Sequence, residues 1–177
     1  LSLENTYNED DVTKWYQKME EVTGPNPEVV VECKFDGTSA SIHFSHGRVI
    51  KALTRGSGIV GEDITTNVLN MSEFHHVKST FNGECRGEMI MSKDEFKRLN
   101  QDNKYANARN LTSGTIKLLD VEEFKKRNLW FYAYWLEGSK NLRHSDDLEL
   151  LKKMGFRTGK YYLCHSLKEV LDAIDDI

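Results

Sequence analysis

The chain has 177 residues, of which 38% are hydrophobic and 29% are charged, a composition typical of a globular protein and not of a disordered one. The formal net charge of −4 excludes a broadly basic nucleic-acid-binding protein, although a local basic groove is compatible with it. No apolar run approaches the roughly 20 residues of a membrane-spanning helix, and the polar, acidic start does not have the pattern of a signal peptide.

The first third of the chain predicts one helix followed by three strands. Asn8 is placed to cap a helix over residues 9–21, which has an acidic first turn and apolar residues at helical spacing. After a loop that contains both prolines, the sequence predicts a Val-rich strand over 28–34, an alternating strand over 39–44 and a third strand over 48–53. Because short turns join them, we expect an antiparallel meander.

The rest of the chain predicts two strands and three serine-capped helices. The strands cover residues 83–91 and 129–136, and the helices follow Ser92, Ser145 and Ser166, ending near residue 100, near Gly155 and at the end of the chain. Strands and helices do not follow a regular βαβ order, so we expect an α+β fold of antiparallel β-sheets flanked by helices. One continuous domain over residues 1–177 is the simplest organisation.

The three cysteines predict a reducing environment. Cys33, Cys85 and Cys164 are an odd number without paired spacing, so a disulfide framework or a structural zinc site is not expected. A cytoplasmic location follows from this.

Two segments carry residue types suited to phosphate chemistry. Lys34 follows the first predicted strand and stands beside a turn formed by Asp36 and Gly37, although a hairpin turn with a solvated lysine fits these residues equally well. Farther on, Arg55 begins a Gly-rich stretch over 54–63, in which glycines let backbone amides approach an anion and arginine binds phosphate in a bidentate manner. The alternative for this stretch is a flexible surface loop.

Two further segments are compatible with binding or with purely structural roles. Residues 84–88 place two carboxylates around Arg86, where a salt-bridged sheet edge is the alternative. Residues 106–110, with Lys117 farther on, are basic and amide-rich, and a capped helix explains them equally well.

The order of these segments is more specific than any one of them. Six blocks closely resemble, in order and spacing, the adenylation domain of NAD-dependent DNA ligases: SLEN, ECKFDG, TRGSGIVGED, ECRGE, ANARN and FYAYW. The resemblance covers essentially the whole chain and implies a nucleotidyltransferase (ATP-grasp-like) fold that is incomplete at its C-terminus. Two later lysine motifs of the family, its N-terminal nicotinamide-recognition domain and its C-terminal DNA-binding modules are not in this sequence. The chain is then a partial domain, either a piece of a larger ligase or one subunit of a split one.

The resemblance also implies the role of each site residue. Lys34 matches the nucleophile that attacks the adenylyl phosphorus of NAD and forms a lysyl-AMP intermediate. The positions that match the adenosine site are Glu32 at the adenine edge, Ser2 and Leu3 along the base and its phosphate, Glu88 at the ribose hydroxyls and Tyr134 stacked on adenine. Arg55 matches a position near the phosphate or the ribose, Asp36 a position at a metal or the ribose, and Arg109 and Lys117 positions at the phosphate of the leaving group or of the nicked DNA. Mg²⁺ is the implied metal, and no set of metal ligands is assigned.

Three positions depart from the family pattern. Ser57 stands where aspartate is usual, Ala108 where proline is common, and Lys117 where arginine is usual, which loses bidentate geometry but keeps the charge. None of these departures removes the nucleophile.

Activating the lysine is the main energetic requirement of this chemistry. A free lysine amine has a pKa of about 10.4, and lowering it by about three units needs roughly 4 kcal/mol. Neighbouring cations (Arg55, Mg²⁺ and Lys117) together with partial burial are the expected sources. Because the later lysine motifs are missing, we expect the isolated chain to self-adenylate poorly or not at all.

The implied function is the nucleotidyltransferase step of nick sealing in duplex DNA, with NAD, nicked DNA and the remainder of the ligase as partners, and no membrane. Two alternatives stay open. The first is an ATP- or GTP-dependent relative, such as an RNA ligase or a capping enzyme. The second is a non-catalytic subunit of a split ligase that binds a nucleotide or DNA without forming a covalent bond.

Overall fold

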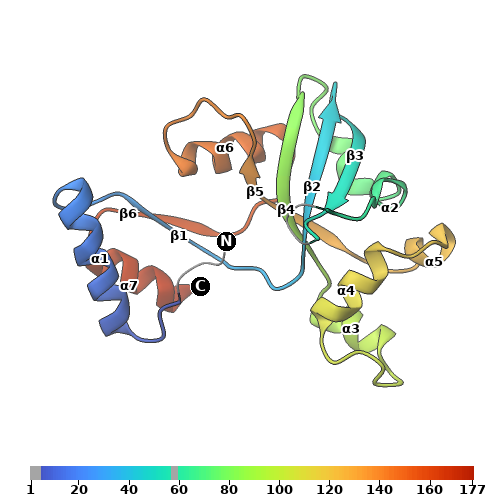
Figure 1. Ribbon diagram of the computed structural model, residues 1–177, viewed down its shortest axis with the longest axis horizontal. Helices are drawn as coiled ribbons and strands as arrows, with labels where there is room; N and C mark the ends of the chain where they lie inside the picture. The colour runs from blue at the N-terminus through green and yellow to red at the C-terminus, as the bar shows by residue number, and fades with distance from the viewer. Residues whose placement is uncertain (1–4, 57–59) are drawn as a thin grey trace. The chain divides into compact units, whose positions relative to one another are not determined.

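The computed structural model describes residues 5–56 and 60–177, which divide into two compact units. One unit contains residues 5–33 and 160–177, and the other contains residues 34–159. Each unit combines an antiparallel sheet with helices, so the predicted α+β class is confirmed (Figure 1).

The first unit packs two helices against a two-stranded sheet. Its elements are α1 (Glu9–Thr23), β1 (Val29–Glu32), β6 (Tyr161–Cys164) and α7 (Leu167–Asp176). The predicted caps of both helices are confirmed: the Asn8 side chain accepts from the Asp11 N–H at 2.9 Å, and the Ser166 hydroxyl accepts from the Glu169 N–H at 3.3 Å. The buried core of this unit consists of Tyr16, Cys164, Val170 and Ala173.

The predicted meander is wrong in its first strand. β1 does not pair with β2 (Thr38–Ser45); it pairs antiparallel with β6, from the far end of the chain. β2 does form the predicted hairpin with β3 (Arg48–Thr54). A Val-rich strand is compatible with either partner, and the sequence near residues 161–164 was not predicted to be a strand.

The second unit is built on a four-stranded antiparallel sheet in the order β3-β2-β4-β5. β4 covers Gly83–Ile90 and β5 covers Trp130–Leu136, close to the predicted strands. Alternation gives the sheet one buried face, whose side chains include Ile42, Cys85, Met89 and Phe131. The opposite face carries the polar residues of the same strands, which is where the candidate site lies.

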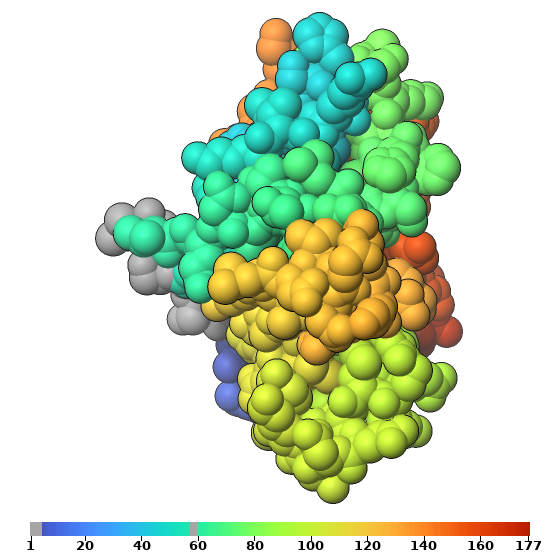
Figure 2. Space-filling model, turned by 90° about the vertical axis from the view of Figure 1, so that its right-hand side faces the viewer, coloured from blue at the N-terminus to red at the C-terminus, as the bar shows by residue number. Residues whose placement is uncertain are grey.

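Short helices cover this sheet. They are α2 (Thr65–Leu69), the 3₁₀ helix η1 (Ser72–His76), α3 (Lys93–Leu99), α4 (Ala108–Ile116), α5 (Val121–Lys125) and α6 (His144–Met154). Figure 2 shows one side of the molecule, where the yellow-to-orange residues of α4 and α5 lie between the green residues of α2 and the yellow-green residues of α3.

Two of the predicted serine caps in the chain are correct and one is wrong. The Ser92 hydroxyl accepts from the Glu95 N–H at 3.1 Å and caps α3, as expected. α6 instead begins at His144, so Ser145 lies inside its first turn and is buried, and the cap position is Arg143. The sequence also did not predict α2, η1 or α5, which are each only five residues long.

Candidate active site

Lys34 lies in the connection that leads into β2. The predicted strand over 28–34 ends earlier, at Glu32, so Lys34 lies outside it. The side chains of Lys34 and Asp36 are both exposed in a non-repetitive segment over 33–37. The partial burial expected of Lys34 is therefore absent in this structure.

Gly37 explains why this segment lies close to the sheet. Its position is buried, and a Cβ atom there would fall 2.0 Å from the carbonyl oxygen of Met89 in β4. Only glycine permits so close an approach of two backbones. The backbone N–H of Gly37 also donates to the carboxylate of Glu88, which holds the segment over the outer face of β4.

Glu88 is the electrostatic centre of the site. Its carboxyl group is half-buried, and burial raises its pKa, although the hydrogen bond from Gly37 and the positive charges of Lys34 and Arg109 act to lower it. The negative charge of Asp36 acts in the same direction as burial. The amine, both carboxylates and one guanidinium thus lie within electrostatic range of one another.

Tyr134 belongs to the same face of the sheet. Its hydroxyl lies 2.8 Å from the hydroxyl of Ser39 in β2, and burial raises the pKa of Tyr134. Its phenol group also interacts electrostatically with Glu88 and Arg55. Ser39 pairs directly with Glu88 in the register of β2 and β4, so these side chains occupy adjacent positions on the outer face.

Most of the aromatic residues in β5 lie outside the buried core. Phe131 is buried, with 1% of its surface exposed, whereas Trp130 and Trp135 are 40% and 47% exposed. Tyr132 and Tyr134 are partly exposed. A register shift in the pairing of β4 with β5 interrupts the alternation, so both Tyr134 and Trp135 are accessible.

Arg55 lies beside Ser39, next to the neck of the Gly-rich loop, by which we mean the point where Thr54 and Glu62 pair. The Arg55 N–H donates to the Ser39 carbonyl at 3.1 Å, and Thr54 and Glu62 close the neck with two hydrogen bonds of 3.0 Å. A Cβ at Gly61 would fall 1.9 Å from the Thr54 carbonyl oxygen, so this crossing also requires glycine. Of the loop, Ser57 lies outside the described residues.

The amide-rich segment 106–110 forms the start of a capped helix. The Asn107 side chain accepts from the Asn110 N–H at 2.8 Å, so α4 begins at Ala108 and Arg109 lies in its first turn. The Arg109 guanidinium reaches Asp36 at 3.4 Å. Helix capping and a position in the site are therefore compatible, although the sequence offered them as alternatives.

Lys117 lies at the other end of α4. Eight residues of helix place its Cα about 12 Å from that of Arg109, and its amine pairs with Glu62 at the neck of the Gly-rich loop. In this structure Lys117 therefore neutralises a carboxylate and is not grouped with Lys34 and Glu88.

A salt-bridged sheet edge was the structural alternative for the segment around Arg86. Arg86 does form ion pairs, with Glu84 at 2.8 Å and with Glu137 at 2.9 Å, but β4 is an internal strand of the sheet. Glu88, two residues farther along, faces Lys34 and Arg109 instead.

The remaining predicted positions fall elsewhere. Glu32 is the last residue of β1 and belongs to the first unit, whereas Lys34 is the first residue of the second. Ser2 and Leu3 lie outside the described residues. The sequence analysis missed Ser39, although its place in the alternating pattern of β2, opposite to the apolar residues, already put it on the polar face.

Within the ranges 5–56 and 60–177, no group of three or more His, Cys, Asp or Glu side chains is arranged to hold a metal ion. In the same ranges, no helix has the length and apolar character needed to cross a bilayer. The three cysteines are free thiols, and Cys85 and Cys164 are buried.

The chemistry of the grouped side chains is compatible with a nucleotide. They offer a carboxylate for hydroxyl donors, an aromatic ring for a base, two guanidinium groups for phosphates and an exposed amine. Comparisons with known proteins identify the family of the chain. The family model of the NAD-dependent DNA ligase adenylation domain matches residues 1–177.

Curated relatives agree with this match. A DNA ligase of Chlorobium phaeovibrioides is 39% identical over 191 residues, covering 96% of this chain and 28% of that protein. DNA ligases of Prosthecochloris aestuarii and Shouchella clausii are 36% and 34% identical, over 98% and 97% of this chain and 29% and 27% of their own lengths. The chain thus spans less than a third of the length of these relatives.

Among solved structures, the ATP-dependent DNA ligase from bacteriophage T7 in complex with ATP matches with a TM-score of 0.43 and 15% identity, over 94% of this chain and 56% of that chain. The family match extends over every block that the sequence analysis singled out. The chain belongs to the family of NAD-dependent DNA ligase adenylation domains.

Proposed function

We propose that this chain carries the adenylyl-transfer step of an NAD-dependent DNA ligase, with Lys34 as the nucleophile. The observation that supports this most directly is the convergence of Lys34, Glu88 and Arg109 on one face of the second unit. Family membership supports the same reaction. NAD is the substrate that donates the adenylyl group.

The step is a substitution at phosphorus. Lys34 Nζ attacks the adenylyl phosphorus of NAD, a nitrogen–phosphorus bond forms, and the phosphorus–oxygen bond to nicotinamide mononucleotide breaks. The amine loses a proton and nicotinamide mononucleotide leaves with the bridging oxygen. Arg55 and Arg109 stabilise the negative charge on the phosphate oxygens, where fixed cations have their largest effect.

The other side chains bind the adenosine. Glu88 accepts hydrogen bonds from the ribose hydroxyls, which suits a carboxylate already held in place by the Gly37 N–H. Tyr134 stacks on adenine, its ring oriented by the hydrogen bond to Ser39. The family resemblance assigns Glu32 to the adenine edge and Ser2 and Leu3 to the base and its phosphate, and it assigns Lys117 to a phosphate, which Lys117 can contact after leaving Glu62.

Mg²⁺ fits this site only as a substrate-bound ion. Mg²⁺ is commonly held by one or two carboxylates together with substrate phosphates, and Asp36 is an exposed carboxylate two residues after Lys34. When bound, the ion neutralises phosphate charge. Asp36 then has to exchange its ion pair with Arg109 for the metal, which leaves Arg109 available to phosphate.

The macromolecular partners follow from the ligase family. We propose that nicked duplex DNA receives the adenylyl group and that the remainder of the ligase completes the reaction, in the same polypeptide or as a separate subunit. The free thiols fit a reducing cytoplasm.

Intact-mass analysis tests the proposal. The 177-residue chain is incubated with NAD and Mg²⁺, alone and with the remaining part of the ligase supplied as a separate polypeptide. With the remaining part present we expect one added AMP, absent in Lys34→Arg and retained in the control Lys51→Arg, whose exposed side chain lies on β3; the chain alone should acquire little or none.

Each alternative predicts a different result. An adduct from ATP but not from NAD would favour an ATP-dependent relative. AMP binding without any adduct, even with the remaining part of the ligase present, would favour a non-catalytic subunit.

A further inference from the structure

The aromatic ring of Phe35, which lies between Lys34 and Asp36 in the chain, holds the Lys34 segment against the sheet. Phe35 packs on Tyr132 of β5, with ring centroids 4.2 Å apart and ring planes inclined by 35°. Phe35 follows Lys34 directly in the chain, so the position of its ring limits where the Lys34 backbone can lie. Phe35 has no part in the chemistry proposed above.

Tyr132 is itself covered by an arginine from a distant part of the chain. The guanidinium carbon of Arg157 lies 5.6 Å from the ring centroid of Tyr132 and 5.3 Å from that of Trp130. Both distances are within the range of cation–π attraction. A planar guanidinium suits a position over two aromatic rings better than an ammonium group does.

The backbone around Arg157 keeps this side chain over β5. The Arg157 carbonyl accepts from the Ala133 N–H at 2.8 Å, and Thr158 forms a parallel bridge with Ala133. The arginine is therefore fixed at its Cα beside the strand whose rings it covers.

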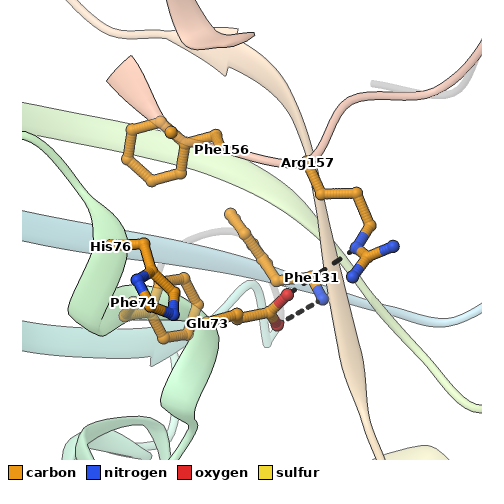
Figure 3. Close-up of a pocket in the computed structure, with 7 residues that line it drawn as sticks. Glu73, Phe74, His76, Phe131, Phe156 and Arg157 are labelled. Atoms are coloured by element: carbon orange, nitrogen blue, oxygen red, sulfur yellow. Dashed lines mark hydrogen bonds and ion pairs between the residues drawn. The ribbon is translucent and has the colours of Figure 1, made fainter. Parts of the chain in front are cut away.

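A carboxylate from η1 holds the other side of the guanidinium. Glu73 Oε2 lies 3.8 Å from Arg157 Nε, and Glu73 Oε1 accepts from the Phe131 N–H at 2.8 Å (Figure 3). These residues line a cavity of about 180 Å³ together with Phe74, His76 and Phe156. Figure 3 shows Glu73 pointing towards both partners, so η1, β5 and Arg157 meet at this carboxylate.

We propose that Arg157, held by Glu73, is a positioning residue for the adenylyl-transfer reaction. The ordered stack of Arg157 on Tyr132 and of Tyr132 on Phe35 fixes the backbone of Lys34 relative to Glu88. This inference rests on the proposed function of Lys34. Arg157 acts through two aromatic rings and does not touch the nucleotide.

The first test measures the position of the segment without any nucleotide. Hydrogen exchange is followed at the amides of residues 34–37 in the wild-type chain and in Arg157→Ala. We expect Gly37 to exchange at least about tenfold faster in the variant, because its N–H donates to Glu88 only while the segment is in place. Arg143→Ala removes an exposed arginine that pairs with Asp146 and is the matched control.

The second test measures the reaction. The rate of AMP attachment to Lys34 is determined against NAD concentration, with the remaining part of the ligase present. We expect the maximal rate to fall between about 10- and 100-fold in Arg157→Ala, because small displacements of a nucleophile have effects of this size. The NAD concentration at half-maximal rate stays nearly unchanged.

Conservative variants separate positioning from general stability. Tyr132→Phe keeps the ring and should behave like the wild type, whereas Tyr132→Leu should behave like Arg157→Ala. Arg157→Lys keeps the charge beside Glu73 but lacks the planar group, and should recover only a small part of the rate. Thermal unfolding of each variant shows whether it remains folded at the assay temperature.

The outcomes are distinguishable. Wild-type exchange at Gly37 in Arg157→Ala overturns the inference, whether or not the chain is adenylated. Faster exchange with an unchanged rate of AMP attachment also overturns it. If the wild-type chain never acquires AMP, the proposed function fails, and the inferred role in catalysis fails with it.

Discussion

The hydroxyl groups of Ser39 and Tyr134 lie 2.8 Å apart and join β2 to β5 across β4, the strand between them. Glu88 of β4 pairs with Ser39 in the sheet register, so this hydrogen bond lies next to Glu88, the residue that we propose binds the ribose. The aromatic ring that we assign to adenine is thereby oriented before any nucleotide binds. Preorganisation of this kind reduces the entropy lost on binding.

The Tyr134 ring and its hydroxyl have separable roles. Tyr134→Leu should weaken AMP binding about tenfold or more, because stacking of a base on an aromatic ring is worth about 1–3 kcal/mol. Tyr134→Phe keeps the ring and should lose only about 1 kcal/mol of stability with the hydrogen bond to Ser39. Calorimetric titration with AMP measures the affinity of each variant, and denaturant unfolding measures its stability. Equal AMP affinities of Tyr134→Leu and Tyr134→Phe would refute adenine stacking.

The ion pair between Arg109 and Asp36 should contribute to binding and little to stability. Its side chains are 62% and 74% exposed, and exposed pairs are worth about 1 kcal/mol or less. Arg109→Ala should leave the unfolding temperature nearly unchanged but weaken NAD binding several-fold, with a smaller difference at high salt. Arg48→Ala, another exposed arginine on β3, serves as the control. Identical NAD affinities of the two variants at low salt would contradict a role for Arg109.

Two glycine-to-alanine substitutions should change the free energy of unfolding in opposite directions. Gly37→Ala places a methyl group 2.0 Å from the Met89 carbonyl oxygen and should destabilise the second unit by about 1–3 kcal/mol. In Gly114→Ala, within α4, the nearest atom is 3.5 Å away, an ordinary contact, so the variant should gain about 0.5–1 kcal/mol. Denaturant unfolding measures both, and a neutral Gly37→Ala would mean that the Lys34 segment does not lie against β4.

The partly buried carboxyl group of Glu73 should make the free energy of unfolding fall with increasing pH. Burial raises its pKa from 4.5 to about 7, although the hydrogen bond from Phe131 and the charge of Arg157 oppose this. The folded chain therefore binds the proton more tightly than the unfolded chain, and the free energy of unfolding decreases between about pH 4.5 and 7, by about 3 kcal/mol in total.

Glu73→Gln tests this dependence. The amide cannot ionise but its oxygen can still accept from the Phe131 N–H, so the variant should be more stable than the wild type at pH 8 and similar at pH 4.5. Urea titrations across this pH range give the comparison. Parallel pH profiles for the two proteins would show that Glu73 ionises normally.

The sequence was sufficient for the local elements of this protein because their signals lie within a few residues. Asn8, Ser92 and Ser166 accept hydrogen bonds from N–H groups only three residues away, and the strands near 39–44 and 83–91 are visible in their alternation. The ordered motifs were likewise sufficient to predict the family. These motifs also indicate the candidate site residues Lys34, Arg55, Glu88 and Tyr134 without any knowledge of the fold.

Tertiary structure decided which of these elements and side chains meet. No local pattern indicates that β1 pairs with β6, because hydrogen bonds of a strand satisfy any partner of suitable length and the choice depends on packing of the whole unit. The fold also decides the partner of Lys117 in this structure, which is Glu62; its assignment to a phosphate stays a prediction. Arg157 carried no signal at all: its place over Tyr132 arises only because the backbone after α6 returns to Ala133 in β5.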